Sequence, residues 1–395
     1  MIKLRTVLIY SSYLLAVAGC WKTYVYFFDS AAPQIVVSGI AEQGVYKGAN
    51  PYSIAANKKG YAYLFIDEKP WGTHKISKNK PLNLCLDASK LSNGPHNLRV
   101  AVIDSTYHHN TCQQKINFSV DQTPLLVSVI PDPAENKVLQ GRTHHLQFSV
   151  NKPIQSATAT IFGHSYSCIA QNKGSLTYEA FIPVACEEMA GTYPLNLTVV
   201  DQASNKIELA NNLEVIACQF KREALKVDTA KIAQEESLGS DARTRERMLA
   251  KIIETSPQEK LWRGPFCTPI DIVRTSCEFG TIRTTQHKGR YAHKALDVTN
   301  TPKSVVWAPQ DGIVVLKERF ADSGNVIAID HGCGIISMFY HLDDFAKLEV
   351  GDKLAKGNPI GTIGKTGYTT GYHLHWEMRV NNVPVDPMQW TSAIF

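Results

Sequence analysis

Two segments of the chain repeat one pattern, and this repeat restricts the possible folds more than any other feature of the sequence. Residues 94–104 and 191–201 each run from a glycine to an aspartate with the same spacing, with apolar residues at alternating positions. Such alternation places the apolar side chains on one face of a β-strand. Because the pattern recurs after about one hundred residues, among turns rich in Gly, Pro and Asn, it predicts two β-sandwiches in series.

The two predicted sandwiches occupy residues 31–121 and 122–218, with a linker near residues 121–124. Their strand pattern resembles that of bacterial immunoglobulin-like modules. For these modules, a role as spacers is favoured over a role as specific binding modules.

The N-terminal segment, residues 1–30, has the layout of a secretory signal or a signal anchor, because Lys3 and Arg5 precede an apolar run from residue 7 to residue 18. Three outcomes are open. The apolar character continues to residue 28, which is about enough length for an uncleaved membrane anchor. Alternatively, the segment is cleaved as a lipoprotein signal with lipidation of Cys20, or is removed entirely. Each outcome places the rest of the chain outside the cytoplasm, in the periplasm or cell envelope, and the first two tether it to a membrane.

Residues 219–260 differ in composition from the β-rich segments on either side. They are rich in Lys, Arg, Glu, Ala and Gln. Apolar residues recur at helical spacing, namely Met248, Leu249, Ile252 and Ile253. This pattern predicts a charged helical connector between the second sandwich and the C-terminal third of the chain.

Overall composition excludes some classes of protein. The chain has 395 residues, of which 44% are hydrophobic, and a formal net charge of +5. It has no block of Lys and Arg and no basic patch interleaved with aromatic residues, so binding of nucleic acid is disfavoured. A mildly cationic surface suits an anionic cell-wall polymer.

Cysteine usage also fits an oxidising compartment, because the cysteines other than Cys20 form an even set. Pairing within each predicted domain would give three disulfides, Cys85–Cys112, Cys168–Cys186 and Cys267–Cys277.

Candidate metal ligands lie in two distant segments of the C-terminal third. His373 and His375 are two residues apart, so on a strand both side chains would project to the same side. Upstream, His293 and Asp297 offer another imidazole and a carboxylate. A catalytic zinc ion commonly takes three nitrogen or oxygen ligands and leaves one position for water. His293, Asp297 and His375 form such a set, and the glycine-rich run at residues 361–371 could bring a substrate to the strand.

Residues 261–395 contain a longer ordered series of motifs. The series reads Phe279, Gly280 and Arg283; His293 and Asp297; residues 308–314; residues 324–332; residues 340–342; Gly351 and Asp352; the glycine-rich run; His373 to His375; and residues 385–387. This order resembles the lysostaphin-type (LytM) family of zinc metallopeptidases, which cut peptidoglycan. The resemblance implies one Zn²⁺ bound by His293, Asp297 and His375, with His341 and His373 as the catalytic imidazoles.

Two positions depart from the family pattern. Ala295 stands where glycine is frequent, and Phe339 stands where a tyrosine is expected, with Tyr340 adjacent. Because neighbouring strand residues face opposite sides, Tyr340 could not simply replace that tyrosine. Arg283 is either a groove residue or part of a structural salt bridge, and Glu377 either orients a ligand histidine or faces solvent.

His331 receives a structural interpretation. It lies between the apolar runs 326–329 and 335–339, a pattern typical of a hairpin turn between two strands.

The sequence thus predicts a mainly β chain with two immunoglobulin-like β-sandwiches, a helical connector and a C-terminal antiparallel β peptidase domain of the LytM type. The expected function is zinc-dependent hydrolysis of peptide bonds in bacterial peptidoglycan. Two alternatives are a non-catalytic activator of another wall hydrolase and an extracytoplasmic metallopeptidase that acts on proteins. The connector could also lie against the catalytic groove and restrain activity. The bond that is cleaved and the oligomeric state stay open.

Overall fold

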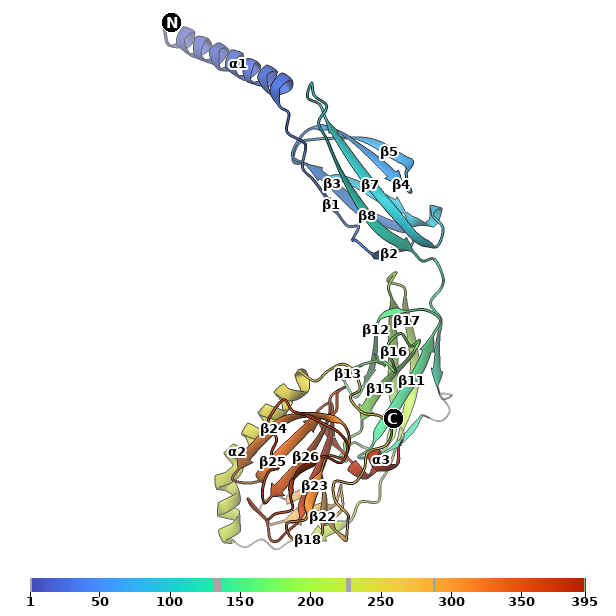
Figure 1. Cartoon of the computed structure of the whole chain (residues 1–395), viewed down its shortest axis with the longest axis vertical. Coiled ribbons are helices and arrows are strands. Elements are labelled where there is room, and N and C mark those ends of the chain that lie inside the picture. The colour runs from blue at the N-terminus through green and yellow to red at the C-terminus, as the bar shows by residue number, and fades with distance from the viewer. Residues whose placement is uncertain (1, 131–135, 225–228, 287–288, 394) are drawn as a thin grey trace. The chain divides into compact units, whose positions relative to one another are not determined.

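The computed structural model describes residues 2–130, 136–224, 229–286, 289–393 and 395, and these residues are mainly in β-strands (Figure 1). The chain divides into two compact units. The first comprises Met1–Leu125 with Asp201–Asn205, and the second comprises Leu126–Val200 with Lys206–Phe395. The predicted mainly β class is therefore confirmed, whereas the exact domain boundaries and the immunoglobulin-like character of the sandwiches stay predictions.

The first unit contains the helix α1 (Ile2–Phe28) and a sandwich of two sheets. One sheet has the order β1 (Ile35–Ser38), β3 (Ala49–Ala56), β6 (Leu82–Asp87), and the other has the order β2 (Gly44–Tyr46), β8 (Thr111–Val120), β7 (Gly94–Asp104), β4 (Gly60–Ile66), β5 (Lys69–Ile76). A short 3₁₀ helix, η1 (Ala88–Lys90), follows β6. Ile54 and Leu86 from the first sheet share one buried core with Val100 and Phe118 from the second.

Within the described part of the chain, no helix combines the length and the apolar character that a membrane crossing requires.

The second unit begins with two further sheets. Their strands are, in order, β10 (Lys137–Leu139), β17 (Lys206–Ile216), β16 (Gly191–Asp201), β12 (Ile154–Ile161) and β13 (His164–Ser167), and then β14 (Ile169–Ala170), β15 (Thr177–Pro183), β11 (Thr143–Val150) and β9 (Val127–Ile130). Leu146 and Phe148 from one sheet and Leu197 and Val215 from the other are buried.

The repeat in the sequence corresponds to β7 and β16, two strands of 11 residues each. Both end at a buried aspartate that closes a turn. Asp104 Oδ1 accepts hydrogen bonds from the backbone N–H groups of Thr106 and Asn110, both at 3.1 Å. Asp201 Oδ1 likewise accepts hydrogen bonds from the backbone N–H groups of Ala203 at 2.9 Å and Asn205 at 2.8 Å. Such aspartate turns explain why the pattern ends in the same residue in both segments.

The rest of the second unit is built on a large antiparallel sheet, as predicted. Its strands are, in order, β19 (Arg274–Cys277), β22 (Leu296–Thr299), β29 (Leu374–Val380), β26 (Ile335–Leu342), β25 (Gly324–Asp330), β24 (Gly312–Phe320) and β27 (Lys353–Leu354), with β30 (Val383–Val385) beside β29. Smaller sheets join β18 (Arg222–Ala224), β20 (Ile282–Thr285) and β21 (Gly289–Ala292), and β23 (Val305–Trp307) with β28 (Pro359–Thr362). The helix α3 (Pro387–Ser392) follows β30.

Both faces of the large sheet are covered. On one face, Val298, Phe339 and Trp376 belong to a core that includes residues from β23 and β28. On the other face, the helix α2 (Thr229–Glu254) packs Leu249 against Met338 and Tyr340 of β26. Figure 1 shows α2 running beside the strands β24 and β25. The residues that predicted the helix, Met248, Leu249, Ile252 and Ile253, are those that contact the sheet. Residues 225–228 of the predicted connector lie outside the described residues.

The predicted disulfides are wrong. All nine cysteines belong to the described residues and each has a free thiol, so the pairs Cys85–Cys112, Cys168–Cys186 and Cys267–Cys277 are not formed. Cys85 lies on β6 and Cys112 on β8, which belong to different sheets of the first sandwich. The Cys267 thiol instead donates to the carbonyl of Pro309 at 3.3 Å. Pairing by proximity in sequence failed because strand order, and not chain order, decides which side chains meet.

His331 has the structural role that the sequence predicts, in the turn between β25 and β26. Its side chain is fully buried. Its Nδ1–H donates to the carbonyl of Asp311 at 2.7 Å, and its Nε2 accepts from the hydroxyl of Ser337 at 2.8 Å. Both nitrogens are therefore used by the neutral imidazole, and burial lowers the pKa of His331 to about 4.

We expect His331 to make the free energy of unfolding depend on pH. In the unfolded chain its pKa is near 6.5, whereas the folded imidazole resists protonation down to about 4. Between these values the unfolded state binds more protons, so stability is full above pH 6.5 and falls as the pH decreases, by about 3 kcal/mol in all. Urea unfolding of His331→Gln between pH 7 and pH 4 should show a smaller loss than the wild type. An unchanged pH dependence would contradict this assignment.

Candidate active site

Three neighbouring strands, β22, β29 and β26, bring the predicted site residues together. In the register of the sheet, Asp297 on β22 lies opposite His375 on β29, which in turn lies opposite Tyr340 on β26. Residues directly opposite each other project to the same face of an antiparallel sheet. His293 precedes β22 and His373 immediately precedes β29, so both reach the same region.

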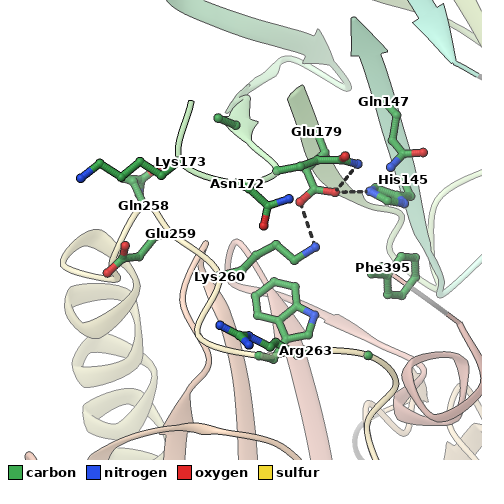
Figure 2. A pocket seen from close by; sticks show the side chains of 14 residues that line it. His145, Gln147, Asn172, Lys173, Glu179, Gln258, Glu259, Lys260, Arg263 and Phe395 are labelled. Atoms are coloured by element: carbon green, nitrogen blue, oxygen red, sulfur yellow. Dashed lines mark hydrogen bonds and ion pairs between the residues drawn. The ribbon is translucent and has the colours of Figure 1, made fainter. Parts of the chain in front are cut away.

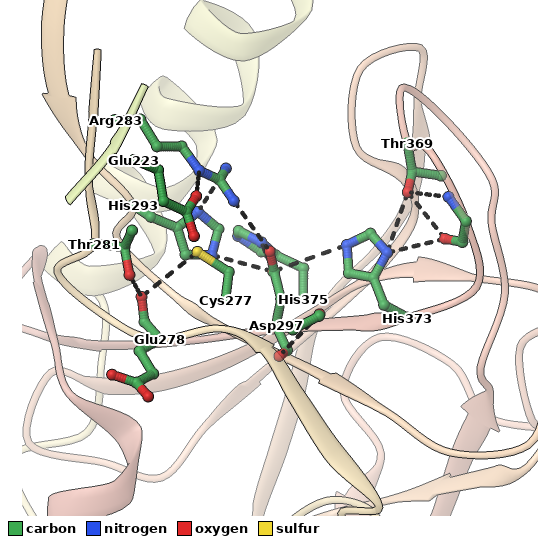
Figure 3. Close-up of polar contacts among 12 residues, drawn as sticks. Glu223, Cys277, Glu278, Thr281, Arg283, His293, Asp297, Thr369, His373 and His375 are labelled. Atoms are coloured by element: carbon green, nitrogen blue, oxygen red, sulfur yellow. Dashed lines mark hydrogen bonds and ion pairs between the residues drawn. The ribbon is translucent and has the colours of Figure 1, made fainter. Parts of the chain in front are cut away.

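The candidate metal-ligand atoms converge on one carboxylate oxygen (Figure 3). Asp297 Oδ1 lies 3.1 Å from His293 Nε2 and 2.7 Å from His375 Nδ1. His293 is buried, and its Nε2 approaches this carboxylate without forming a hydrogen bond of normal geometry. Ligand atoms around a tetrahedral zinc ion at about 2.0–2.1 Å lie roughly 3.3 Å from one another. These spacings, together with a buried nitrogen that lacks a well-formed hydrogen bond, fit a metal ion among the three side chains.

Protonation at this cluster also suits metal binding. Burial, the strongest influence on the pKa of His293, lowers it, which keeps the imidazole neutral. Burial alone would raise the pKa of Asp297, but the contacts with His293 and His375 together outweigh it and hold that pKa well below its usual range. A neutral imidazole and an ionised carboxylate are the forms that bind metal ions.

A cysteine and an arginine border the cluster, and the sequence did not predict the cysteine. The ligand atoms of Cys277, His293 and Asp297 all lie within 4.8 Å of one another. His293, Asp297 and His375 already form the three-ligand set that a catalytic zinc commonly takes, so we do not assign the Cys277 thiol as a ligand. Arg283 Nη2 lies 3.9 Å from Asp297 Oδ2, and its Nε lies 3.5 Å from Glu223 Oε2. Arg283 therefore joins an ion-pair network that orients the Asp297 carboxylate.

His341 occupies an irregular position in β26. Asn325 of β25 pairs with Leu342 and Ile327 pairs with Phe339, so Tyr340 and His341 together face a single residue of β25. This is a β-bulge, and His341 has a φ of +59°. Non-glycine residues in this region of φ are strained and are held by their surroundings, often at functional sites.

Hydrogen bonds fix the His341 imidazole. Its Nδ1–H donates to the carbonyl of Thr366 at 2.8 Å, and its backbone N–H donates to the carbonyl of Ser323 at 3.0 Å. Burial, helped by the nearby imidazoles, lowers the pKa of His341 to about 4. The side chain is therefore neutral near pH 7, with the lone pair on Nε2.

His373 stands beside His341, with ring centroids 4.8 Å apart. Its Nδ1–H donates to the carbonyl of Gly371 at 3.0 Å and lies 3.1 Å from the hydroxyl oxygen of Thr369. Its Nε2 points toward the ligand cluster, 3.8 Å from Asp297 Oδ1 (Figure 3). All five predicted site residues are thus neighbours, and their individual roles stay predictions.

Glycines in the run before His373 allow the backbone to pack closely on the His341 segment. A Cβ at Gly364 would lie 2.2 Å from the backbone nitrogen of Asp343 and 2.5 Å from the carbonyl oxygen of His341. Gly367, with a φ of +78°, approaches Gly324 so closely that a Cβ would lie 2.3 Å from its nitrogen. These glycines allow the close packing of the loop whose Thr366 carbonyl orients His341. That the run also brings a substrate to the strand stays a prediction.

Tyr340 and Glu377 lie behind His375. The Tyr340 ring contacts the His375 ring edge-on, with centroids 4.9 Å apart, and its hydroxyl donates to Glu377 Oε2 at 2.9 Å. Phe339 lies in the core on the other face of the sheet. The predicted opposition of Phe339 and Tyr340 is therefore confirmed, and Glu377 supports His375 through the Tyr340 ring instead of facing solvent.

A separate polar pocket of about 1010 Å³ lies between β11, β15 and residues 258–264 (Figure 2). At its wall the fully buried carboxylate of Glu179 contacts His145 Nε2 at 2.8 Å and Lys260 Nζ at 2.9 Å. None of the five predicted site residues lines this pocket. The Lys260 ammonium group balances the charge of the Glu179 carboxylate, and we place the chemistry at the histidine cluster.

Comparisons with known proteins concern the region that contains this cluster. The sequence profile of Peptidase family M23 matches residues 291–387, a range that includes all five histidine and aspartate residues of the site. Residues of this chain are 34% identical over 121 residues to the DD-carboxypeptidase/endopeptidase Mpg of Neisseria meningitidis, covering 30% of this chain and 27% of that protein. They are 32% identical over 121 residues to the peptidoglycan DD-endopeptidase ShyC of Vibrio cholerae, covering 30% and 28%.

A solved structure assigned to peptidase family M23, from Pseudomonas aeruginosa, aligns with a TM-score of 0.44 and 22% identity over 65% of this chain and 95% of that chain. The matched region spans only about a quarter of the length of the curated relatives. Residues 291–387 thus match peptidase family M23, and the site residues within them stand in the order expected of the lysostaphin-type (LytM) family.

Proposed function

We propose that the chain is a zinc-dependent endopeptidase that hydrolyses peptide bonds in bacterial peptidoglycan. The observation that carries this proposal is the convergence of His293, Asp297 and His375 on one point, with the imidazoles of His341 and His373 alongside. The names of the relatives support this proposal, since ShyC is named a peptidoglycan DD-endopeptidase and Mpg a DD-carboxypeptidase/endopeptidase.

In the proposed reaction, a Zn²⁺ held by His293, Asp297 and His375 would supply a water of lowered pKa and polarise the scissile carbonyl. His341 and His373 each direct Nδ1–H at a backbone carbonyl, which leaves Nε2 of each ring as the nitrogen that can accept a proton. One imidazole can take the proton of the attacking water. A protonated imidazole can then stabilise the oxyanion or return the proton to the leaving amine.

We further propose that the bond cleaved is a DD-peptide cross-link, which is supported by the names of the two relatives. Peptidoglycan lies outside the cytoplasm, so the proposed location is the periplasm or cell envelope. Tethering by the N-terminal segment, either as an uncleaved anchor or through lipidated Cys20, is a separate proposal. The two sandwiches would then act as spacers between the tether and the enzyme.

Digestion of purified sacculi by the purified full chain tests the function. Zinc-loaded protein should release soluble peptides, chelation should stop the release, and added Zn²⁺ should restore it. Mass spectrometry of the products identifies the bond. Release of peptides from a denatured protein instead of from sacculi would favour the protein-directed alternative. Stimulation of a second wall hydrolase without any release by this chain would favour the activator alternative.

A further inference from the structure

The connector helix α2 contacts the catalytic region through Arg245. The Arg245 side chain is only 14% exposed. Its Nη1 donates to Asp322 Oδ2 at 2.6 Å and also to the hydroxyl of Ser323. The guanidinium carbon lies 5.5 Å from the centroid of the Tyr340 ring and 5.9 Å from that of Phe320. A charge-assisted bond that is largely shielded from solvent holds its partners more firmly than an exposed pair does.

The residues that Arg245 holds are those that orient His341. The carbonyl of Ser323 accepts the backbone N–H of His341 at 3.0 Å, and the carbonyl of Asp322 accepts the N–H of Tyr368 at 2.7 Å. The loop that contains Tyr368 also contains Thr366, whose carbonyl accepts the His341 imidazole N–H at 2.8 Å. Residues 322 and 323 are therefore bonded both to the His341 backbone and to the loop that directs its ring.

These contacts matter because the backbone of His341 is strained. A φ of +59° in a bulge persists only where neighbouring groups hold it. The groups that do so here, residues 322–323 and the loop at 364–368, make close contact with each other at Gly324 and Gly367. Arg245 contacts this assembly from a helix outside the region that matches the family profile, which begins at residue 291.

We propose that Arg245 is a positioning residue, which couples the connector helix to the orientation of His341. The expected effect on kcat rests on the proposed function, whereas the expected effect on the order of the backbone around His341 does not. In this role the connector supports activity and does not restrain it. Removal of the contact would disorder the catalytic imidazole and lower activity, instead of uncovering the imidazole and raising activity. Arg247 provides a matched control, since it lies on the same helix and is exposed.

The test compares full-length Arg245→Ala, Arg245→Lys, Asp322→Asn and Arg247→Ala. Amide hydrogen exchange at His341 and in residues 366–370 should be faster in Arg245→Ala and Asp322→Asn, by about tenfold, and unchanged in Arg247→Ala. On a DD-cross-linked muropeptide dimer, kcat of Arg245→Ala should fall by about 10- to 100-fold, with KM and bound zinc unchanged, because small misplacements of a catalytic group cost this much. Arg245→Lys should recover part of the loss.

Three results would overturn the proposal: exchange at His341 that is the same in Arg245→Ala and Arg247→Ala, a kcat that is equally unaffected in both, or a higher activity in Arg245→Ala. Asp322→Asn removes the negative charge that pairs with Arg245 and so weakens the same contact from the sheet side, which still answers the question if Arg245→Ala does not fold. A wild type that is inactive on the dimer would contradict the proposed function, while the exchange measurement would still decide the positioning role.

Discussion

Replacing His375 with alanine is expected to abolish zinc binding and peptidoglycan hydrolysis together. His375 Nδ1 lies 2.7 Å from Asp297 Oδ1, on the strand that pairs with β22, so its removal leaves only two of the three proposed ligands. A catalytic zinc site requires three protein ligands. Since the ion contributes several kcal/mol to stabilising the transition state, its loss corresponds to at least about a 10³-fold lower activity. Metal analysis of the purified variant and digestion of sacculi measure both effects.

Two variants serve as controls for this result. His164→Ala removes an exposed histidine of the second sandwich and should leave both zinc content and activity unchanged. Cys277→Ser changes the thiol that lies near His293 and Asp297, and it should retain zinc because the three proposed ligands are all still present. Zinc lost from Cys277→Ser but retained in His375→Ala would show that the cysteine, and not His375, completes the site.

The part of the site that lies on regular strands could be predicted from the sequence. Asp297 and His375 lie opposite each other on adjacent antiparallel strands, and the two-residue spacing of His373 and His375 directs both rings to one region. Alternation along a strand is a local property, so it can be read from a short segment. No local pattern joins His293 to His373, some eighty positions later. The order of the motifs along the chain was needed to place these residues in one site.

Other features could not be predicted because they depend on tertiary contacts. The bulge at His341 arises from the register between β25 and β26, and nothing in the residues around it indicates a positive φ. Cys277 reaches the site only because β19 pairs with β22. The same dependence on strand order made the predicted disulfides wrong. For α2, helical spacing identified the residues that contact the sheet, but it gave no signal that Arg245 lies beside the His341 loop.

His341→Ala should lose turnover while it keeps the metal. The ring of His341 lies beside those of His373 and His375, with centroids 4.8 Å and 6.0 Å away, but its hydrogen bonds are to the carbonyls of Thr366 and Ser323. Its neutral Nε2 is available to exchange protons with the water or the leaving amine, and loss of such a group lowers kcat by about 10²- to 10⁴-fold. Zinc content should stay at the wild-type level, which distinguishes this variant from His375→Ala. Full activity in His341→Ala would remove it from the mechanism, whereas loss of zinc would show that it supports the ligands instead of the proton transfer.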